Sequence, residues 1–344
     1  MLNRLPDYLH ITNVVSFELK RLLNQLNPDK VGLLVDENTK EYCLSKLDLR
    51  PDILVEIKSG EQEKNLQTCN LIWKKLTGAS FSRKSVLINL GGGVIGDMGG
   101  FAASTYKRGI AFINIPTTLL SQVDASIGGK LGVDYQGLKN HIGVFQHPYA
   151  VLIDKVFLNT LSKRQLLSGY AEVIKHALIY DQNHWENLNA TAFDELDWTD
   201  IIPKSIHIKN QVVTKDPLEN DVRKILNFGH TLGHAIESYF LNSNQSLLHG
   251  EAVAIGMILE SHLSLQLNLI SIEEYKEINQ HIKSRFCLPN TLPNYEALVT
   301  FLRQDKKNIN GKISFSLLEK IGSCVQDKFV SIEYIKNSLL NYAK

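Results

Sequence analysis

The chain has 344 residues, 44% hydrophobic and 21% charged, which is ordinary for a globular protein with room for two domains. Its formal net charge of +1 gives no broad electrostatic basis for binding nucleic acid or a membrane surface. The four cysteines are far apart and form no Cys-x-x-Cys pair, so we expect thiols in a reducing compartment. The sequence shows no signal-peptide pattern and no apolar run of membrane-spanning length, which predicts a cytoplasmic protein.

Strands and helices alternate in the first half of the chain. Helical spacing of apolar residues, and short apolar runs typical of buried strands, are both present. The predicted helices are 14–26 and 61–76, and the predicted strands are 30–36, 53–57, 85–90 and 110–115. This alternation indicates βαβ units and a mostly parallel sheet. Asp36 ends the first of these strands, where an α/β sheet holds a nucleotide ribose. The alternative is an ordinary aspartate at a solvent-exposed strand end.

A glycine-rich segment, residues 91–100, follows the strand at 85–90. Glycines at a strand-to-helix junction let backbone N–H groups approach a phosphate, and the helix N-terminus adds partial positive charge. The segment differs from the first-strand dinucleotide fingerprint, because it follows a later strand and starts with three glycines. Thr117 and Thr118 end the next strand beside it, where they either reach a cofactor or cap the following helix.

Residues 124–145 form a polar segment with five glycines and little periodicity, which predicts a loop between rigid elements. Lys130, Lys139 and Asn140 in it are candidate anion binders, and the alternative is a solvated hairpin with ordinary surface lysines.

The second half of the chain is helical, with a strand expected only near 312–318. The predicted organisation is an α/β domain over residues 1–155 and a helical domain over 156–344. Lys209, Arg223 and the lysines at 306–307 are either site residues or charges on solvated faces.

Five residues of the helical half are candidate metal ligands. His230 and His234 stand four residues apart and share a helix face, and His249 follows a polar loop. Glu172 and His176 have the same spacing on another predicted helix. A catalytic zinc needs only three protein ligands, so spacing does not choose among the five.

Six motifs taken together resemble one family, the 3-dehydroquinate synthases of the sugar-phosphate cyclase superfamily. They are GGGVIGDMGGF (91–101), IPTTLLSQVDASIGGKLGVD (115–134), LKNHIGVF (138–145), GYAEVIKHALI (169–179), NFGHTLGHAIES (227–238) and LLHGEAVAIGM (247–257). They occur in the family's order over nearly the whole chain.

The resemblance implies a zinc- and NAD-dependent lyase of the shikimate pathway, with cobalt as an alternative metal. Such an enzyme converts 3-deoxy-D-arabino-heptulosonate 7-phosphate into 3-dehydroquinate and phosphate by transient oxidation, phosphate elimination, re-reduction and intramolecular aldol closure. The implied fold is a Rossmann-like N-terminal domain joined to a helical domain, with the active site in the interdomain cleft. The implied partners are the sugar-phosphate substrate and a second copy of the chain in a homodimer.

The resemblance also assigns residues. It implies that Glu172, His230 and His249 bind the metal, that His234 faces the substrate and that His176 is structural. Positions matching the family's cofactor-binding residues are Asp36, Glu61, Lys64, Gly92, Gly93, Asp97, Thr117, Thr118, Lys130 and Lys139. Positions matching its catalytic and substrate-binding residues are Arg108, Asp124, Lys130, Lys139, Asn140, Lys175, Lys209, Arg223, Asn227, His234 and Lys306, with Lys307 as the alternative to Lys306.

Some positions depart from the family pattern: Leu131, Leu138, Pro217 and Asp221 replace the usual Thr, Gly, Glu and Gly. None of them removes a charged site residue. Another cyclase, such as 2-deoxy-scyllo-inosose synthase, and a metal-dependent alcohol dehydrogenase remain as alternatives. The set Asp124, Asn227 and His234 favours the dehydroquinate branch.

Overall fold

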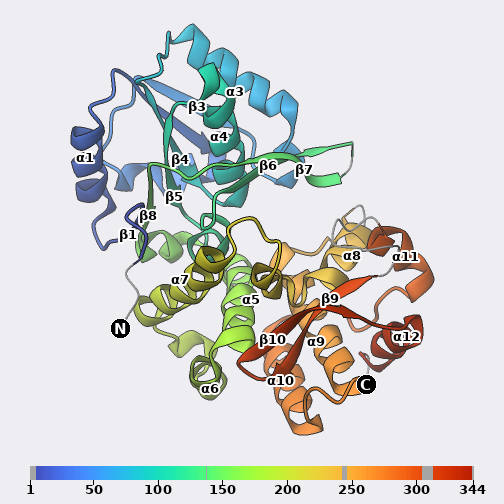
Figure 1. Ribbon diagram of the computed structural model, residues 1–344. Coiled ribbons are helices and arrows are strands. Elements are labelled where there is room, and N and C mark those ends of the chain that lie inside the picture. Colours follow the sequence, from blue (N-terminus) through green and yellow to red (C-terminus); the bar gives the residue numbers. More distant parts are fainter. Residues whose placement is uncertain (1–4, 137, 242–245, 304–312, 343–344) are drawn as a thin grey trace. The chain divides into compact units, whose positions relative to one another are not determined.

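The computed structural model describes residues 5–136, 138–241, 246–303 and 313–342, and the chain folds as two compact units, residues 1–162 and 163–344 (Figure 1). The predicted combination of an α/β region and a helical region is confirmed. Among the described residues no helix is both long enough and apolar enough to cross a membrane.

The first unit is built on a parallel six-stranded sheet in the order β1-β8-β5-β4-β2-β3. Its strands are β1 (Leu9–Ile11), β2 (Val31–Asp36), β3 (Ile53–Ile57), β4 (Val86–Gly91), β5 (Ala111–Pro116) and β8 (Ala150–Ile153). The four predicted strands are confirmed as β2, β3, β4 and β5, whereas β1 and β8 were not predicted. The chain leaves β2 toward one edge of the sheet and β4 toward the other, so the glycine-rich segment after β4 lies at a topological switch point.

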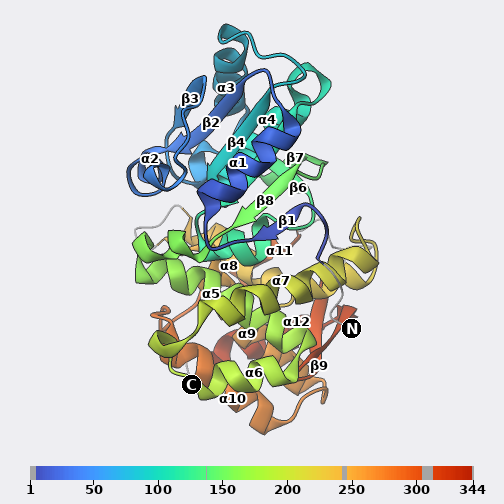
Figure 2. The same ribbon diagram turned by 90° about the vertical axis from the view of Figure 1, so that its left-hand side faces the viewer.

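Helices cover both faces of this sheet. They are α1 (Val15–Leu26), α2 (Glu37–Tyr42), α3 (Leu66–Gly78) and α4 (Gly93–Thr105). Val15, Leu19 and Leu22 of α1 pack on one face, the one toward the viewer in Figure 2. Side chains of α3 and α4 fill a second apolar cluster on the other face. The shorter helical segments are η1 (Leu44–Lys46), η2 (Glu61–Glu63), η3 (Tyr106–Arg108), η4 (Ser121–Ala125) and η5 (Lys155–Thr160).

Two predictions for the first unit are wrong in part. The helix predicted over 61–76 begins only at Leu66, because the Asn65 side chain accepts a hydrogen bond from Thr68 N and caps it there. The polar segment expected as a loop pairs from Lys130 onward as an antiparallel hairpin of β6 (Lys130–Tyr135) and β7 (Leu138–Phe145).

In its described residues the second unit is helical apart from one two-stranded ribbon. Its helices are α5 (Lys163–Tyr180), α6 (Gln182–Ala190), α7 (Trp198–Lys215), α8 (His230–Phe240), α9 (His249–Gln266), α10 (Ile272–Arg285), α11 (Tyr295–Arg303) and α12 (Ile332–Asn341), with short turns η6 (Phe193–Glu195) and η7 (Val222–Asn227). The expected strand is β9 (Ser314–Lys320), which pairs with β10 (Ser323–Phe329). Helix α9 is buried along most of its length and packs against α5, α8, α10, α12 and β9, so it forms the centre of this unit.

Candidate functional site

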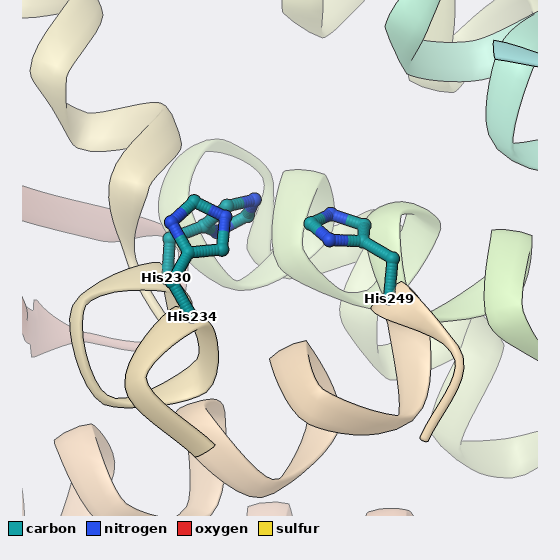
Figure 3. A group of neighbouring side chains, drawn as sticks. All are labelled: His230, His234 and His249. Carbon is teal, nitrogen blue, oxygen red and sulfur yellow. The ribbon is translucent and has the colours of Figure 1, made fainter. Parts of the chain in front are cut away.

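Three histidines meet where α8 and α9 begin. His230 is the first residue of α8, His234 lies one turn later, and His249 is the first residue of α9. One ring nitrogen from each lies within 4.8 Å of the other two. Figure 3 shows the imidazole of His249 pointing toward the rings of His230 and His234. Helix α8 therefore contributes two imidazoles and α9 one to a single cluster.

Glycines allow α8 and α9 to approach closely enough to form this cluster. A Cβ atom on Gly256 of α9 would lie 1.8 Å from the carbonyl oxygen of Gly229, and one on Gly233 would lie 2.9 Å from that of Ala252. Both distances are shorter than any real contact of a Cβ atom. Gly229 also has a φ of +78°, in the left-handed region that favours glycine. Side chains at these positions would push the two helices, and with them their histidines, apart.

Glu172 of α5 brings a carboxylate to the same place. Its Oε1 lies 3.4 Å from Nε2 of His230 and 3.5 Å from Nε2 of His249, and its Oε2 contacts Nζ of Lys175. The side chain is fully buried. A buried carboxylate facing two imidazole nitrogens is a donor set that fits a divalent metal such as zinc.

Burial and neighbouring charges shift the pKa values of Glu172, His230 and His249 in different directions. Burial alone would raise the pKa of Glu172, but Lys175 and then His230 hold it well below its usual range. Burial, together with the charge of Lys175, lowers the pKa of His230 to about 4. Burial opposes a charge on His249 as well, yet the carboxylates of Glu172 and Glu237 raise its pKa to about 10. The carboxylates of Glu172 and Glu237 therefore favour positive charge at this cluster.

The nitrogens that face away from Glu172 also have partners. Nδ1 of His249 lies 3.4 Å from Oε2 of Glu237 in α8, and Nδ1 of His230 lies 3.1 Å from the carbonyl oxygen of Phe228. Partners of this kind orient metal-binding imidazoles and fix their tautomers. Sequence reasoning missed Glu237. Its signal was its position on the histidine face of the helix, three residues after His234 and seven after His230.

His176, the fifth ligand candidate, has one ring nitrogen within 4.8 Å of a Glu172 carboxylate oxygen and also contacts α7. Its Nδ1 lies 2.6 Å from the hydroxyl of Ser205 in α7, and its side chain is fully buried.

Lys209 of α7 and Arg223 of η7 are buried cations, 6% and 2% exposed. Asn227 donates to Oε1 of Glu219 over 3.0 Å.

One carboxylate organises the loop that carries Arg223. Asp216 accepts hydrogen bonds from the backbone N–H groups of Asn220, Asp221 and Arg223, at 3.0, 2.7 and 3.1 Å. Burial would raise the pKa of Asp216, but these three donors hold it below its usual value. The Arg223 guanidinium donates to the carbonyl oxygen of Pro217 over 2.5 Å. The two departures from the family pattern, at positions 217 and 221, thus enter these bonds through their backbone atoms.

The first unit contains a separate candidate site at the glycine-rich segment. Gly91 of β4 is paired with Pro116 of β5, and Thr117 N donates to the Gly91 carbonyl oxygen over 3.0 Å, so the two strand ends adjoin as predicted. A pocket of about 400 Å³, including the part open to solvent, lies there. Its lining includes Gly92, Gly93, Asp97 and Lys130.

A buried lysine connects this pocket to the hairpin. Nζ of Lys64 lies 2.5 Å from Oδ2 of Asp97 and 2.6 Å from Oδ1 of Asn140. Burial works against the charge on Lys64, but Asp97 raises the pKa of this ammonium above its usual value. Lys139 lies 3.6 Å from Oε1 of Glu61. Five predicted site residues therefore form one group of charged and polar side chains beside the glycines: Lys64, Asp97 of α4, Glu61 of η2, and Lys139 and Asn140 of β7.

The remaining predicted residues lie at several places. Asp36 caps α2 by accepting from Thr39 N over 2.7 Å. Thr118 accepts from Ser121 N over 3.2 Å, the capping role weighed for it above, while Thr117 is buried. Asp124 is half-buried in η4, and Arg108 is exposed with a φ of +68°. Lys306 and Lys307 lie outside the described residues.

Comparison with known proteins identifies one family for both halves of the chain. A family model described as 3-dehydroquinate synthase N-terminal matches residues 54–168, and one described as 3-dehydroquinate synthase C-terminal matches residues 169–308. The chain is 40% identical over 330 residues to a 3-dehydroquinate synthase of Parabacteroides distasonis, covering 94% of each chain.

Solved structures of related cyclases share the fold. ValA, a 2-epi-5-epi-valiolone synthase from Streptomyces hygroscopicus subsp. jinggangensis 5008 solved with NAD+ and Zn2+ bound, has a TM-score of 0.87 at 25% identity, covering 100% of this chain and 98% of ValA. A 2-deoxy-scyllo-inosose synthase complexed with carbaglucose-6-phosphate, NAD+ and Co2+ has a TM-score of 0.83 at 23% identity, covering 97% of this chain and 96% of that one. With the matches to both family models and the 40% identical relative, the chain belongs to the 3-dehydroquinate synthase family.

Proposed function

We propose that this chain is a 3-dehydroquinate synthase, a phosphate-eliminating lyase that converts 3-deoxy-D-arabino-heptulosonate 7-phosphate into 3-dehydroquinate and phosphate. The observation that carries the proposal is that both halves of the chain match this one family, and that each half presents a site of the required chemistry.

Glu172, His230 and His249 would hold the metal, with zinc as the ion and cobalt as its substitute. The Lys175 ammonium binds one oxygen of Glu172, which leaves the other directed at the two imidazoles. His234 is half-buried beside them, with its ring centroid 5.1 Å from that of His230. We assign it to the substrate, where its imidazole can hold or pass a proton.

The first unit would bind NAD. The glycines place backbone N–H groups at the start of α4, where a pyrophosphate is favoured. Lys64, Lys130 and Lys139 bring positive charge to the same region, and Asp97 and Glu61 hold two of these ammonium groups in place. Asp36 at the end of β2, with Thr117 and Thr118 directly after β5, would complete the proposed cofactor site.

The substrate carries a carboxylate and a phosphate, so its binding groups should be cations and amides. In the second unit Lys175, Lys209, Arg223 and Asn227 fit this requirement, and in the first unit Arg108, Lys130, Lys139 and Asn140, with Asp124 for a hydroxyl. When bound, zinc would polarise the substrate hydroxyl and NAD would accept and later return a hydride, so the net reaction is not a redox reaction.

The test is phosphate release by the purified chain loaded with zinc and NAD. We expect phosphate from the heptulosonate phosphate, none from glucose 6-phosphate, and no accumulation of NADH. Release from glucose 6-phosphate alone would assign the chain to the 2-deoxy-scyllo-inosose branch. Stoichiometric NADH without phosphate would indicate a metal-dependent alcohol dehydrogenase.

We further propose that the enzyme works in the cytoplasm as a homodimer. The exposed Arg108 sits in a turn where Lys107, Arg108 and Gly109 all have positive φ, which presents its side chain at the surface. Light scattering during gel filtration measures the mass directly, and a value near one chain's 38.8 kDa would refute the dimer.

A further inference from the structure

A buried glutamate of α9 contacts the backbone that carries His230. The Glu260 side chain is fully buried. Its Oε2 accepts a hydrogen bond from Gly229 N over 2.7 Å, and its Oε1 accepts one from Leu232 N over 2.9 Å. These two N–H groups bracket His230, so the carboxylate spans the first turn of α8.

Helix α8 needs such an acceptor from outside. The first N–H groups of a helix have no partner within the helix, and a side chain at the N-cap usually accepts one of them. Here the N-cap residue is Gly229, which has no side chain to do so. The Glu260 carboxylate takes this role from another helix, and its negative charge suits the positive end of the helix dipole.

The position of Glu260 on α9 links it to the metal site. It lies three helical turns after His249, so both residues project from about the same face of α9. The same face carries Gly256, whose contact with Gly229 brings α8 against α9. Helix α9 therefore supplies one imidazole itself and binds the backbone that holds another.

We propose that Glu260 is a positioning residue for the metal site: by fixing the first turn of α8 it sets the direction in which His230 presents its imidazole. This inference rests on the proposed role of His230 as a metal ligand. Without the carboxylate, Gly229 N and Leu232 N lose a buried acceptor, and the turn is free to shift by the few tenths of an ångström that metal coordination does not tolerate.

A purely structural role would lower stability without touching the metal, so the test needs a matched control. Glu274 of α10 provides it, because its two oxygens also accept from backbone N–H groups, those of Ser271 and Ile321, at 2.8 and 3.0 Å. The variants are Glu260→Gln and Glu274→Gln in the full chain. Glu260→Asp, which keeps the charge but withdraws the carboxylate, is the second variant in case Glu260→Gln does not fold.

The measurement is titration of the metal-free protein with Co2+, followed by the visible absorption of the bound ion, with the unfolding temperature recorded in parallel. We expect Glu260→Gln, or Glu260→Asp in its place, to bind Co2+ about ten- to a hundredfold more weakly, the loss typical of groups that support metal ligands, and to change the absorption bands. Glu274→Gln should keep the wild-type affinity and spectrum.

Wild-type affinity and an unchanged spectrum in the Glu260 variant, with only a lower unfolding temperature, would overturn the proposal. An equal loss of affinity in Glu274→Gln would overturn it too. Failure of the proposed metal site looks different: the wild-type chain itself would bind no Co2+, or His230→Ala would bind it as the wild type does.

Discussion

Two groups of glycines, one at the candidate site of each unit, serve different purposes. In the first unit the glycines at the start of α4 have room for a side chain: a Cβ atom on Gly93 would make only ordinary contacts, at 3.7 Å or more, and one on Gly96 would meet nothing within 4 Å. In the second unit a Cβ atom on Gly250 or Gly256 would lie 1.9 or 1.8 Å from a backbone oxygen. The first set leaves room for a ligand, and the second brings helices together.

The chemistry of the two sites differs accordingly. The candidate cofactor site exposes backbone at the end of a sheet, whereas the candidate metal site consists of buried and half-buried side chains held by buried carboxylates. Changes in the first unit should therefore act on ligand affinity, and changes in the second should act on folding and metal content together.

The largest effect is expected from the metal ligands of the second unit. His230→Ala and His249→Ala should each abolish metal retention, because each removes one of three donors, while His234→Ala should keep the metal and lose catalytic rate. Atomic absorption on the purified variants measures the metal, and phosphate release measures the rate. Loss of metal in His234→Ala together with retention in His249→Ala would mean that His234, and not His249, is the second histidine ligand.

Gly256→Ala tests the helix-packing role of glycine in the second unit. The added methyl group would collide with the Gly229 backbone, so we expect the free energy of unfolding to fall by about 3 kcal/mol or more. Urea unfolding followed by circular dichroism measures it. Gly93→Ala in the first unit is the control. Equal losses of stability in the two variants would show that the glycines of the two sites do not differ in how tightly they are packed.

The second unit should also be the acid-sensitive one. His281 of α10 is 2% exposed, its Nδ1 lies 2.9 Å from Oδ1 of Asn189, and its Nε2 lies 3.2 Å from the Tyr170 hydroxyl. Burial, with a smaller effect of Arg285, lowers its pKa from 6.5 to about 3. Between these values the unfolded chain binds a proton that the folded chain does not, so stability should fall as the pH drops below 6.5.

This loss is expected to reach roughly 2 kcal/mol by about pH 5. Thermal unfolding between neutral and mildly acidic pH measures it, and His281→Gln should make the dependence shallower. His141→Gln, at an exposed histidine of β7 in the first unit, should not. An unchanged slope in His281→Gln would place the acid sensitivity elsewhere.

The smallest effect is expected at the glycine-rich segment. Gly93→Ala fits the folded chain, so its unfolding temperature should stay near that of the wild type, while NAD binds about tenfold more weakly, or about 1.4 kcal/mol. Fluorescence titration with NADH measures the affinity. Gly78→Ala, at the end of α3 where a Cβ atom meets nothing within 4 Å, is the matched control. Unchanged NADH affinity in Gly93→Ala would show that no ligand comes close to this backbone.

Periodicity predicted the central strands well, because buried parallel strands are continuous apolar runs. It failed at β6 and β7, where Gly132 and Gly143 stand opposite each other and interrupt the alternation that marks a strand. A Cβ atom on Gly143 would lie 2.4 Å from the Leu131 carbonyl oxygen, so the close pairing of the two strands requires a glycine here. In the sequence alone, the same glycines are typical of a loop.

The spacing of single residues left five metal-ligand candidates open, because it describes one helix at a time. The contacts of Glu172 with His230 and His249 depend on how α5, α8 and α9 pack, and local spacing does not contain that packing. Glu237 and Glu260 were missed for the same reason. The role of each depends on its partner on the neighbouring helix.

The loop between α7 and η7 shows how a site can tolerate sequence change. Its shape depends on one side chain, Asp216, which gathers three backbone N–H groups, and Arg223 is held by a carbonyl oxygen that any residue at position 217 would supply. Substitutions at positions 217 and 221 can therefore accumulate without moving the guanidinium. A randomised library of this loop should keep its active members as long as Asp216 is retained.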